Sequence, residues 1–248
     1  MEVMAACHVH STWSYDGCWA LADLSCRFRR RGYRVLMMTE HDQGFTASRY
    51  DEYREACARA SSSEMLVVPG IEYSDAANRV HVLVWGDVPF LGNDLPTIEV
   101  LERTVAANGV AVLAHPTRKD AWKCFEPTWA SKLAGIEMWN RKYDGWAQSK
   151  TAGALLSATE TLPFVGLDFH TSRQSFPLGM VLDVQTDVSE SRVLECVRLR
   201  RCHPLVFGLP LNHKIVRASA TALSIAEDSR RRAASIARAA KALIADKH

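Results

Sequence analysis

The sequence lacks several features that would assign the chain to a particular class of protein. It has no CxxC pair, and its seven cysteines are odd in number and irregularly spaced. That pattern argues against a disulfide framework and favours reduced thiols in a cytoplasmic protein. No apolar run approaches the ~20 residues that a membrane-spanning helix needs. The first residues show no basic stretch followed by a long apolar one, so we expect no signal peptide.

Glycine-rich phosphate loops and a strong net charge are also missing. No GxGxxG or GxxxxGK[ST] pattern follows an apolar segment, which weakens the case for an open nucleotide-binding sheet. The net charge is only +2 over 248 residues, which is too small to indicate nucleic-acid binding. A small anionic substrate stays compatible with this charge, because a local group of basic side chains can bind it.

Apolar segments of strand length alternate with amphipathic segments of helix length along the chain. About seven such β-then-α units predict a parallel sheet covered by helices and favour a (β/α) barrel, with an open doubly wound sheet as the alternative. The predicted strands span residues 2–10, 35–38, 65–71, 80–85, 110–114, 135–139, 164–167 and 178–184. The predicted helices span residues 20–31, 49–60, 97–108, 146–158 and 189–201.

The end of the chain differs in composition from the rest. Residues 218–247 are rich in alanine and arginine and include the run Arg230-Arg231-Arg232. This composition predicts one or two amphipathic helices packed on the barrel, in preference to a nucleic-acid-binding arm. We see no internal repeat and no low-complexity linker. We therefore expect a single domain over residues 1–248, with a core of residues 1–210 and a helical tail of residues 211–248.

Histidines and acids collect where the predicted strands end. His8 and His10 close the first strand, and in an extended strand their side chains share one face. The other residues of this kind at or near strand ends are Asp16, His41, Glu72, His81, His115, Asp168 and His170. In a parallel barrel the carboxyl ends of all strands lie on one face, which is where active sites occur.

These side chains together indicate a metal centre. Taken singly, His81 is equally a buried core histidine and Glu72 equally a helix cap. Taken together they are hard to explain as packing, because buried imidazoles and carboxylates are costly unless they are paired or bind metal. Histidine and carboxylate ligands without thiolates suit Zn, Mn or Fe, and the number of ligands fits two or three divalent ions.

Read in chain order, these residues form a set of short motifs: His8-Val9-His10 with Asp16, Glu40-His41-Asp42, Gly70-Ile71-Glu72, His81, His115-Pro116 and Asp168-Phe169-His170. The set resembles, in the same order, the motifs of the polymerase and histidinol phosphatase (PHP) superfamily, from about residue 7 to residue 171. No single motif is specific, whereas the set as a whole is. The resemblance implies a distorted (β/α)7 barrel, TIM-like in plan, that holds a trinuclear metal centre and hydrolyses phosphoesters.

The resemblance also distributes the ligands over the ions. The first ion would be held by His8, His10, Glu72 and Asp168. The second ion would be held by Asp16, His41 and His170. The third ion would be held by His81, His115 and a bridging Glu72. The sequence departs from the family pattern at Leu167, Phe169 and Tyr15, which reshapes the pocket without removing a ligand.

Metal ions held in this way suggest a mechanism. A hydroxide bridging two ions would attack phosphorus in line, since one ion alone lowers the pKa of bound water to about 7. Asp42, next to His41, is a candidate to protonate the leaving alkoxide. The equal alternative is that Asp42 orients an imidazole.

Basic side chains lie on the same predicted loops. Arg118, Arg141 and Arg173 are the candidate phosphate-binding residues, because a guanidinium binds phosphate in a planar, bidentate way. Each is equally a solvated loop charge. Lys119 and Lys142 are weaker candidates for the same role.

The sequence therefore predicts a metal-dependent phosphoesterase. Its substrate would be a phosphomonoester or small phosphodiester, such as a nucleotide, a short oligonucleotide end or a sugar or amino-alcohol phosphate. One alternative is an amidohydrolase-like C–N or C–O hydrolase on the same metal barrel. The other is a non-catalytic barrel of the same type that serves as an interaction module.

Overall fold

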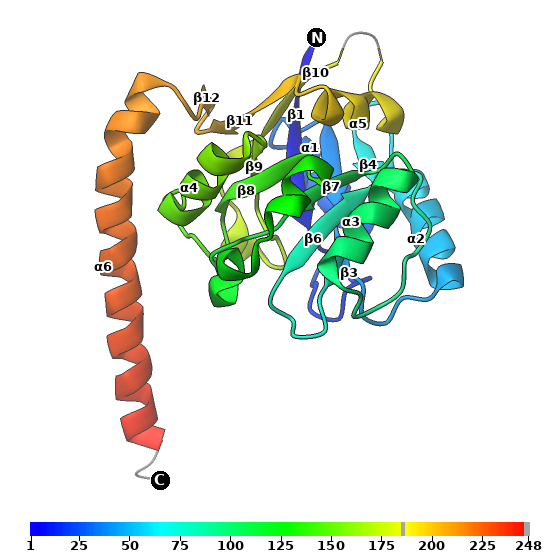
Figure 1. Ribbon diagram of the computed structural model, residues 1–248. Coiled ribbons are helices and arrows are strands. Elements are labelled where there is room, and N and C mark those ends of the chain that lie inside the picture. The colour runs from blue at the N-terminus through cyan, green and yellow to red at the C-terminus, as the bar shows by residue number, and fades with distance from the viewer. Residues whose placement is uncertain (185–186, 246–248) are drawn as a thin grey trace.

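Two six-stranded sheets flanked by helices make up the body of the molecule (Figure 1). The computed structural model describes residues 1–184 and 187–245. The first sheet contains β1 (Glu2–Val9), β2 (Val35–Met38), β4 (Leu66–Val68), β10 (Leu178–Asp183), β11 (Cys202–Val206) and β12 (Leu209–Pro210). The second sheet contains β3 (Glu40–His41), β5 (Gly70–Ser74), β6 (His81–Trp85), β7 (Val110–Leu113), β8 (Gly135–Asn140) and β9 (Leu162–Gly166).

Helices cover the outer faces of these sheets (Figure 1). The α-helices are α1 (Leu21–Arg29), α2 (Ala47–Ala60), α3 (Thr97–Ala106), α4 (Lys150–Thr159), α5 (Glu190–Arg198) and α6 (Lys214–Ala245). Short 3-10 helices are η1 (Arg118–Cys124), η2 (Pro127–Lys132) and η3 (Ser172–Gln174). The predicted α/β class is confirmed. Among the described residues, no helix is long and apolar enough to cross a membrane.

The two sheets are joined to each other along the chain and by hydrogen bonds. Strand order is β12-β11-β10-β1-β2-β4 in the first sheet and β3-β5-β6-β7-β8-β9 in the second. β2 runs through Thr39 into β3, and β4 runs through Pro69 into β5. On the other side, the carbonyls of Cys7 and His8 accept hydrogen bonds from the backbone amides of Leu167 and Phe169. The end of β1 therefore lies beside the segment that follows β9.

The prediction of a parallel sheet is wrong for two of the predicted strands. β6 pairs antiparallel with both β5 and β7, and β10 pairs antiparallel with β1. β11 and β12, which the sequence pattern did not predict, continue this sheet in antiparallel pairing. The reason for β6 is the short link between Ser74 and His81, which is long enough for a hairpin but too short for the crossover that a parallel pair needs. The start of β6 consequently lies at the edge where β5 ends, with Ser74 opposite His81.

The core is built from strands that are buried on both faces. All of β2 and β7, and all of β6 except His81, consists of buried apolar residues. This arrangement explains why these strands read as continuous apolar runs instead of alternating ones. Among the largest fully buried side chains are Trp85, Trp139, Phe164 and Phe169.

Two helices begin two or more residues away from the start that the sequence pattern predicts. α2 begins at Ala47, because the side chain of Thr46 accepts a hydrogen bond from the amide of Arg49; Ser48 was the expected cap. α4 begins at Lys150 and not at residue 146, because Ser149 caps it by accepting from the amide of Ala152. Residues 141–149 therefore form a loop between β8 and α4.

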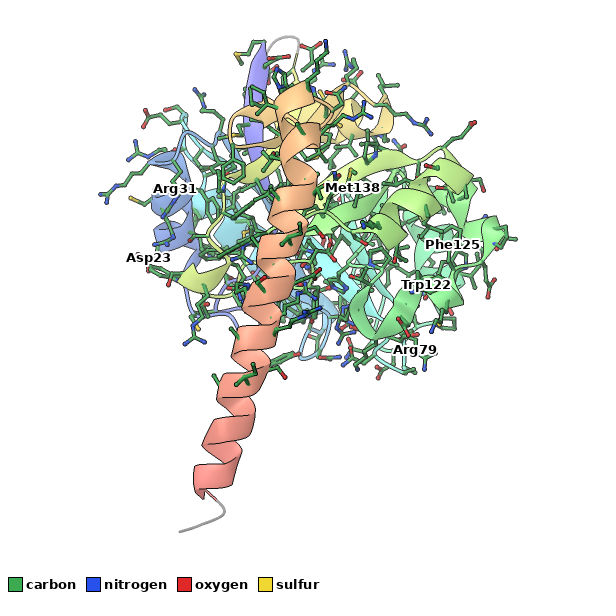
Figure 2. The ribbon with its side chains drawn as sticks, turned by 90° about the vertical axis from the view of Figure 1, so that its left-hand side faces the viewer. Asp23, Arg31, Arg79, Trp122, Phe125 and Met138 are labelled. Carbon is green, nitrogen blue, oxygen red and sulfur yellow. The ribbon has the colours of Figure 1, made fainter. Side chains whose placement is uncertain are left out.

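The chain ends in one long helix, α6, whose first half lies across the body while its last turns extend past it (Figure 2). Val216 and Glu227 are buried where the helix meets the body, whereas Ile215, Ile225 and Ile236 are exposed. One helix, α6, spans Lys214–Ala245 of the predicted tail; residues 246–248 of that tail lie outside the described residues. Its polar contact with the body is made to the loop between β8 and α4.

Replacement of Leu83 by alanine tests the packing of the core. Leu83 lies within β6 and is fully buried, so its truncation should leave a cavity and lower the free energy of unfolding by about 2–5 kcal/mol. The matched control is Val105→Ala at an exposed position of α3, for which we expect a change within about 0.5 kcal/mol. Urea denaturation followed by circular dichroism measures both, and equal losses in the two variants would contradict the assignment of the core.

Candidate metal centre

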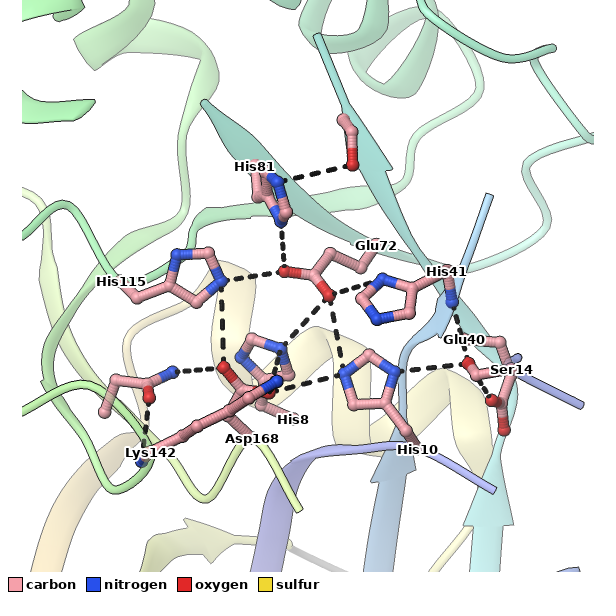
Figure 3. A network of polar contacts seen from close by, with 12 residues as sticks. His8, His10, Ser14, Glu40, His41, Glu72, His81, His115, Lys142 and Asp168 are labelled. Atoms are coloured by element: carbon pink, nitrogen blue, oxygen red, sulfur yellow. Dashed lines mark hydrogen bonds and ion pairs between the residues drawn. The ribbon is translucent and has the colours of Figure 1, made fainter. Parts of the chain in front are cut away.

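All the residues predicted as metal ligands meet at one edge of the sheets, near the ends of β1, β3 and β5 and the start of β6. Figure 3 shows the cluster, with all of them labelled except Asp16 and His170. The ligand side chains are buried except that of Asp16, which is about one third exposed. His81 reaches this edge because β6 runs antiparallel to its neighbours. The antiparallel strand that departs from the prediction thus accounts for the position of this ligand.

The carboxylate of Glu72 lies at the middle of the cluster. Its Oε1 atom is 2.7 Å from Nδ1 of His81 and 2.8 Å from Nε2 of His115. Its Oε2 atom faces three further imidazoles at 3.1, 3.4 and 3.5 Å, those of His41, His10 and His8. The two oxygens of one carboxylate therefore face two different groups of histidines.

Two aspartates complete these groups. Oδ1 of Asp168 lies 3.8 Å from Nε2 of both His8 and His10. Oδ1 of Asp16 lies 3.4 Å from Nε2 of His41, and its Oδ2 lies 3.0 Å from Nε2 of His170. The three groups that the resemblance implied thus lie side by side and overlap. Potential ligand atoms of His10, His41 and His170 lie within 4.8 Å of one another, and so do those of His8, Glu72 and His115.

Several buried polar atoms of the cluster have no hydrogen-bond partner among the described residues. They are Nε2 of His8, Nε2 of His10, Oε2 of Glu72 and Oδ1 of Asp16. A buried polar atom without a partner costs free energy. Ligands of a tetrahedral ion with bonds of about 2.1 Å lie about 3.4 Å apart, which is close to the separations found here. The donor set therefore fits divalent metal ions.

The other nitrogen of each first-strand histidine is already hydrogen-bonded, which fixes the ring orientation. Nδ1 of His8 donates to Oε1 of Glu137 at 2.8 Å, and Nδ1 of His10 donates to Oγ of Ser14 at 3.3 Å. Ser14 in turn donates to Glu40 at 2.5 Å. These bonds leave the lone pair of each Nε2 pointing into the cluster, as a metal ligand requires.

Glu137 is a residue of this site that the sequence argument missed. Its Oε2 accepts from the amide of His115 at 2.8 Å and from Nδ2 of Asn140 at 2.9 Å, so one carboxylate orients two ligands. Gly166 leaves room for it, since a Cβ there would lie 1.8 Å from Oε1 of Glu137. The only sign in the sequence that Glu137 belongs to the site was its position as a single acid within the apolar strand predicted over residues 135–139.

Three of the candidate ligands have left-handed backbone conformations. The φ angles are 59° at His8, 23° at His115 and 48° at Asp168. The pairing of β1 with β2 shifts register between Cys7 and Val9, so His8 sits in a bulge and not in a regular strand. Bulges of this kind redirect side chains. The common direction of His8 and His10 thus depends on the bulge and not only on strand alternation.

Burial and charge shift the pKa values within the cluster. Burial lowers the pKa of His81 to about 4, so this imidazole is neutral. Burial also opposes the charged form of His41, but its close contacts with the carboxylates of Asp16 and Glu72 outweigh burial and raise the pKa to about 10. Burial would raise the pKa of Asp168, but the nearby His8 and Lys142 lower it to about 2.

A small cavity of about 110 Å³ opens onto the cluster and contains two basic side chains. Arg118 donates from Nε to the hydroxyl of Tyr143 at 3.0 Å, and Lys142 lies with its Nζ atom 3.2 Å from Oδ1 of Asp168. Lys142 also lies 3.3 Å from Nε2 of His170. Both cations therefore face the space beside the metal ligands.

The other predicted residues lie elsewhere. Arg141 stacks on the ring of Phe176 at 5.2 Å, and Arg173 is exposed; neither is among the described residues that line the cavity. Asp42 is buried and is not among the described residues that line the cavity, but its Oδ2 accepts at 3.3 Å from the amide of Ser74, which does line it. Its Oδ1 has no hydrogen-bond partner among the described residues, and burial raises its pKa to about 6.

The fold is shared with several solved structures. One is a two-domain protein of Bacteroides vulgatus that contains a predicted PHP-like metal-dependent phosphoesterase. It is 15% identical to this chain, the match covers 88% of this chain and 68% of that protein, and the TM-score is 0.67. Another is PsfC of Pseudomonas syringae, with 18% identity, 94% and 98% coverage and a TM-score of 0.60. No family model and no curated protein matches the chain.

A third solved structure with this fold is the lesion-specific endonuclease PfuEndoQ of Pyrococcus furiosus. It is 14% identical, and the match covers 80% of this chain and 56% of the endonuclease, with a TM-score of 0.55. The fold of this chain is thus similar to that of a protein with a predicted PHP-like phosphoesterase, which agrees with the resemblance first drawn from the motifs.

Substitution of Glu137 tests whether the orientation of His8 and His115 matters for metal binding. We expect Glu137→Gln to weaken binding of Mn²⁺ or Zn²⁺ by about 10–100-fold, the usual effect of removing a partner of a ligating histidine. The matched control is Glu126→Gln, because Glu126 is exposed and outside the cluster. Isothermal titration calorimetry gives both affinities, and equal values for the two variants would contradict the assignment.

Metal binding should release a proton from His41. Its pKa of about 10 makes the ring cationic at pH 7, and only the neutral imidazole binds metal. Apparent affinity should therefore rise with pH, by about tenfold per unit for each proton released. Titrations in two buffers with different heats of ionisation count the proton. Release that is unchanged in His41→Ala would assign it to another group; His203→Ala, outside the cluster, is the control.

Proposed function

We propose that this protein is a metal-dependent phosphoesterase acting on a phosphomonoester or a small phosphodiester. The observation that carries the proposal is that the buried histidines and carboxylates of the cluster share one cavity with Arg118 and Lys142. Metal ligands alone are compatible with several hydrolases. Two cations at the same cavity favour an anionic substrate group such as phosphate.

We also propose that the two sheets together form the distorted (β/α)7 barrel. The continuity of β2 with β3 and of β4 with β5 supports this reading, as do the hydrogen bonds between β1 and the residues after β9. In this reading residues 1–248 form one domain, and β10 to β12 extend the sheet beyond the barrel.

Two or three divalent ions would occupy the cluster. One would be held by His8, His10, Glu72 and Asp168, another by Asp16, His41 and His170, and a third by Glu72, His81 and His115. Mn, Zn or Fe suits this set of nitrogen and oxygen donors. When bound, such ions act as Lewis acids and lower the pKa of water.

The chain's own residues would bind and orient the phosphate. The ammonium of Lys142 and the guanidinium of Arg118 lie on the cavity wall and would neutralise its non-bridging oxygens as charge develops. Tyr143 holds Arg118 in place by accepting from its Nε atom. Arg141 and Arg173, predicted for the same task, lie outside the cavity lining and are not part of this proposal.

Asp42 is the proposed proton donor to the leaving group. Its raised pKa of about 6 and its unpaired Oδ1 support this role. At saturating metal, we expect turnover in the wild type to fall as the pH rises above about 6, because the carboxyl then loses its proton. Asp42→Asn should reduce turnover, abolish this fall and keep the metal content. Loss of metal in the variant would instead make Asp42 a support for the ligands.

The direct test is hydrolysis by the protein loaded with Mn²⁺. The substrates to compare are phosphomonoesters, cyclic nucleotides and short oligonucleotides, the last because one protein with this fold is a lesion-specific endonuclease. We expect turnover of at least one of them, and Lys142→Met should raise KM while retaining metal. Hydrolysis of amide or carboxylic-ester substrates alone would favour the amidohydrolase-like alternative. No turnover of any substrate by the fully loaded protein would contradict the proposal.

A further inference from the structure

The loop between β8 and α4 supplies two side chains to the cavity. Lys142 and Tyr143 both lie on it, and both line the cavity. The loop begins with a tight turn, in which the amide of Asp144 donates to the carbonyl of Asn140 at 2.8 Å. Oδ1 of Asn140 accepts from the amides of Lys142 and Tyr143. The positions of the two side chains therefore depend on how this loop is held.

The far side of the loop is held by α6. The amide of Trp146 donates to Oε2 of Glu227 at 3.3 Å, and Nη2 of Arg231 donates to the carbonyl of Tyr143 at 2.6 Å. Glu227 is buried although it is charged. It accepts from Arg231 at 2.7 Å and from Arg230 at 2.6 Å, and these bonds lower the pKa of its carboxyl to about 2 against the effect of burial.

The loop is shaped to receive this carboxylate. Gly145 has a φ of 74°, which favours glycine, and a Cβ at this position would lie 2.2 Å from the carboxylate carbon of Glu227. The carbonyl of Gly145 is also fixed from the body, because it accepts from Nε1 of Trp139 at 3.1 Å. The contact between α6 and the loop thus requires an acid at position 227 of the helix and a glycine at position 145 of the loop.

The space beside this contact adjoins the cavity at the metal ligands. A groove of about 750 Å³ lies between the loop and α6, and Arg118 and Tyr143 line both the groove and the cavity. Lys119, Lys150 and Arg231 also line the groove. α6 is therefore next to the substrate cavity and not a remote appendage.

We propose that Glu227 and Arg231 of α6 are positioning residues: they hold residues 141–149 so that Lys142 and Tyr143 face the bound phosphoester. The kinetic part of this inference rests on the proposed function. Neither residue touches the cavity, so both act through the loop. An α6 that shifts, or whose Glu227 is neutralised, would lower substrate affinity without removing a metal ligand.

The test uses variants on both sides of the contact, Glu227→Gln from α6 and Gly145→Ala from the loop. In each, hydrogen–deuterium exchange of peptides covering residues 141–149 should rise about tenfold or more, the scale of one lost charge-assisted hydrogen bond. Exchange in β6 and the metal content should stay as in the wild type. For any phosphoester that the wild type hydrolyses, KM should rise by a similar factor while kcat changes less.

Two further variants separate positioning from general stability. Arg231→Lys keeps a donor for the carbonyl of Tyr143 and should lie close to the wild type, whereas Arg231→Met should resemble Glu227→Gln. Arg232→Ala, at an exposed neighbouring position, is the control. Unchanged exchange in both Glu227→Gln and Gly145→Ala would overturn the inference, and so would exchange that rises throughout the chain. If the wild type hydrolyses no phosphoester, the proposed function fails, and the exchange data still decide whether α6 holds the loop.

Discussion

The contact on which the site depends is that of one carboxylate with five imidazoles. Glu72 ends up at the centre of the cluster because β5 is paired with β3 on one side and with β6 on the other. Each of its oxygens faces a different group of histidines. A charge in this position is stable only when cations or hydrogen-bond donors surround it on all sides. The strand order, the bulge at His8 and the reversed direction of β6 all serve to bring those partners to the same carboxylate.

Much of this arrangement was accessible from the sequence, for a physical reason. Continuous apolar strands are buried in a sheet, and polar residues at their ends have to lie at its edge, so His8, His41 and Glu72 could be brought together without coordinates. The direction of β6 could not be obtained in the same way, because an apolar run reads alike in parallel and antiparallel sheets. The short link of residues 75–80 sets the direction of β6. The prediction considered the order of strands and helices and did not consider the lengths of the links between them.

The residues that the sequence argument misplaced or missed lie in loops or act singly. Arg141 follows a strand end as predicted, yet its side chain turns to Phe176, because a loop residue's direction depends on packing that no spacing encodes. Lys142, one residue later, takes the place in the cavity. Glu137 is a single acid that forms no motif with neighbouring residues, so only its burial in the structure identifies it as part of the site. The late start of α4 has a related cause. Ser149 caps the helix, so that α4 begins at Lys150, and residues 141–149 form the loop on which Lys142 and Tyr143 lie.

The left-handed backbone conformations at His8, His115 and Asp168 lower the stability of the fold but place the ligand side chains where the cluster needs them. Non-glycine residues in this region cost of order 1–3 kcal/mol each, and glycine, which would relieve the cost, has no side chain to bind metal. An ion that binds the folded chain and not the unfolded one shifts the folding equilibrium toward the native state. Ions bound at the proposed metal centre would therefore also stabilise the fold, because their binding would offset the strain of the backbone that presents their ligands.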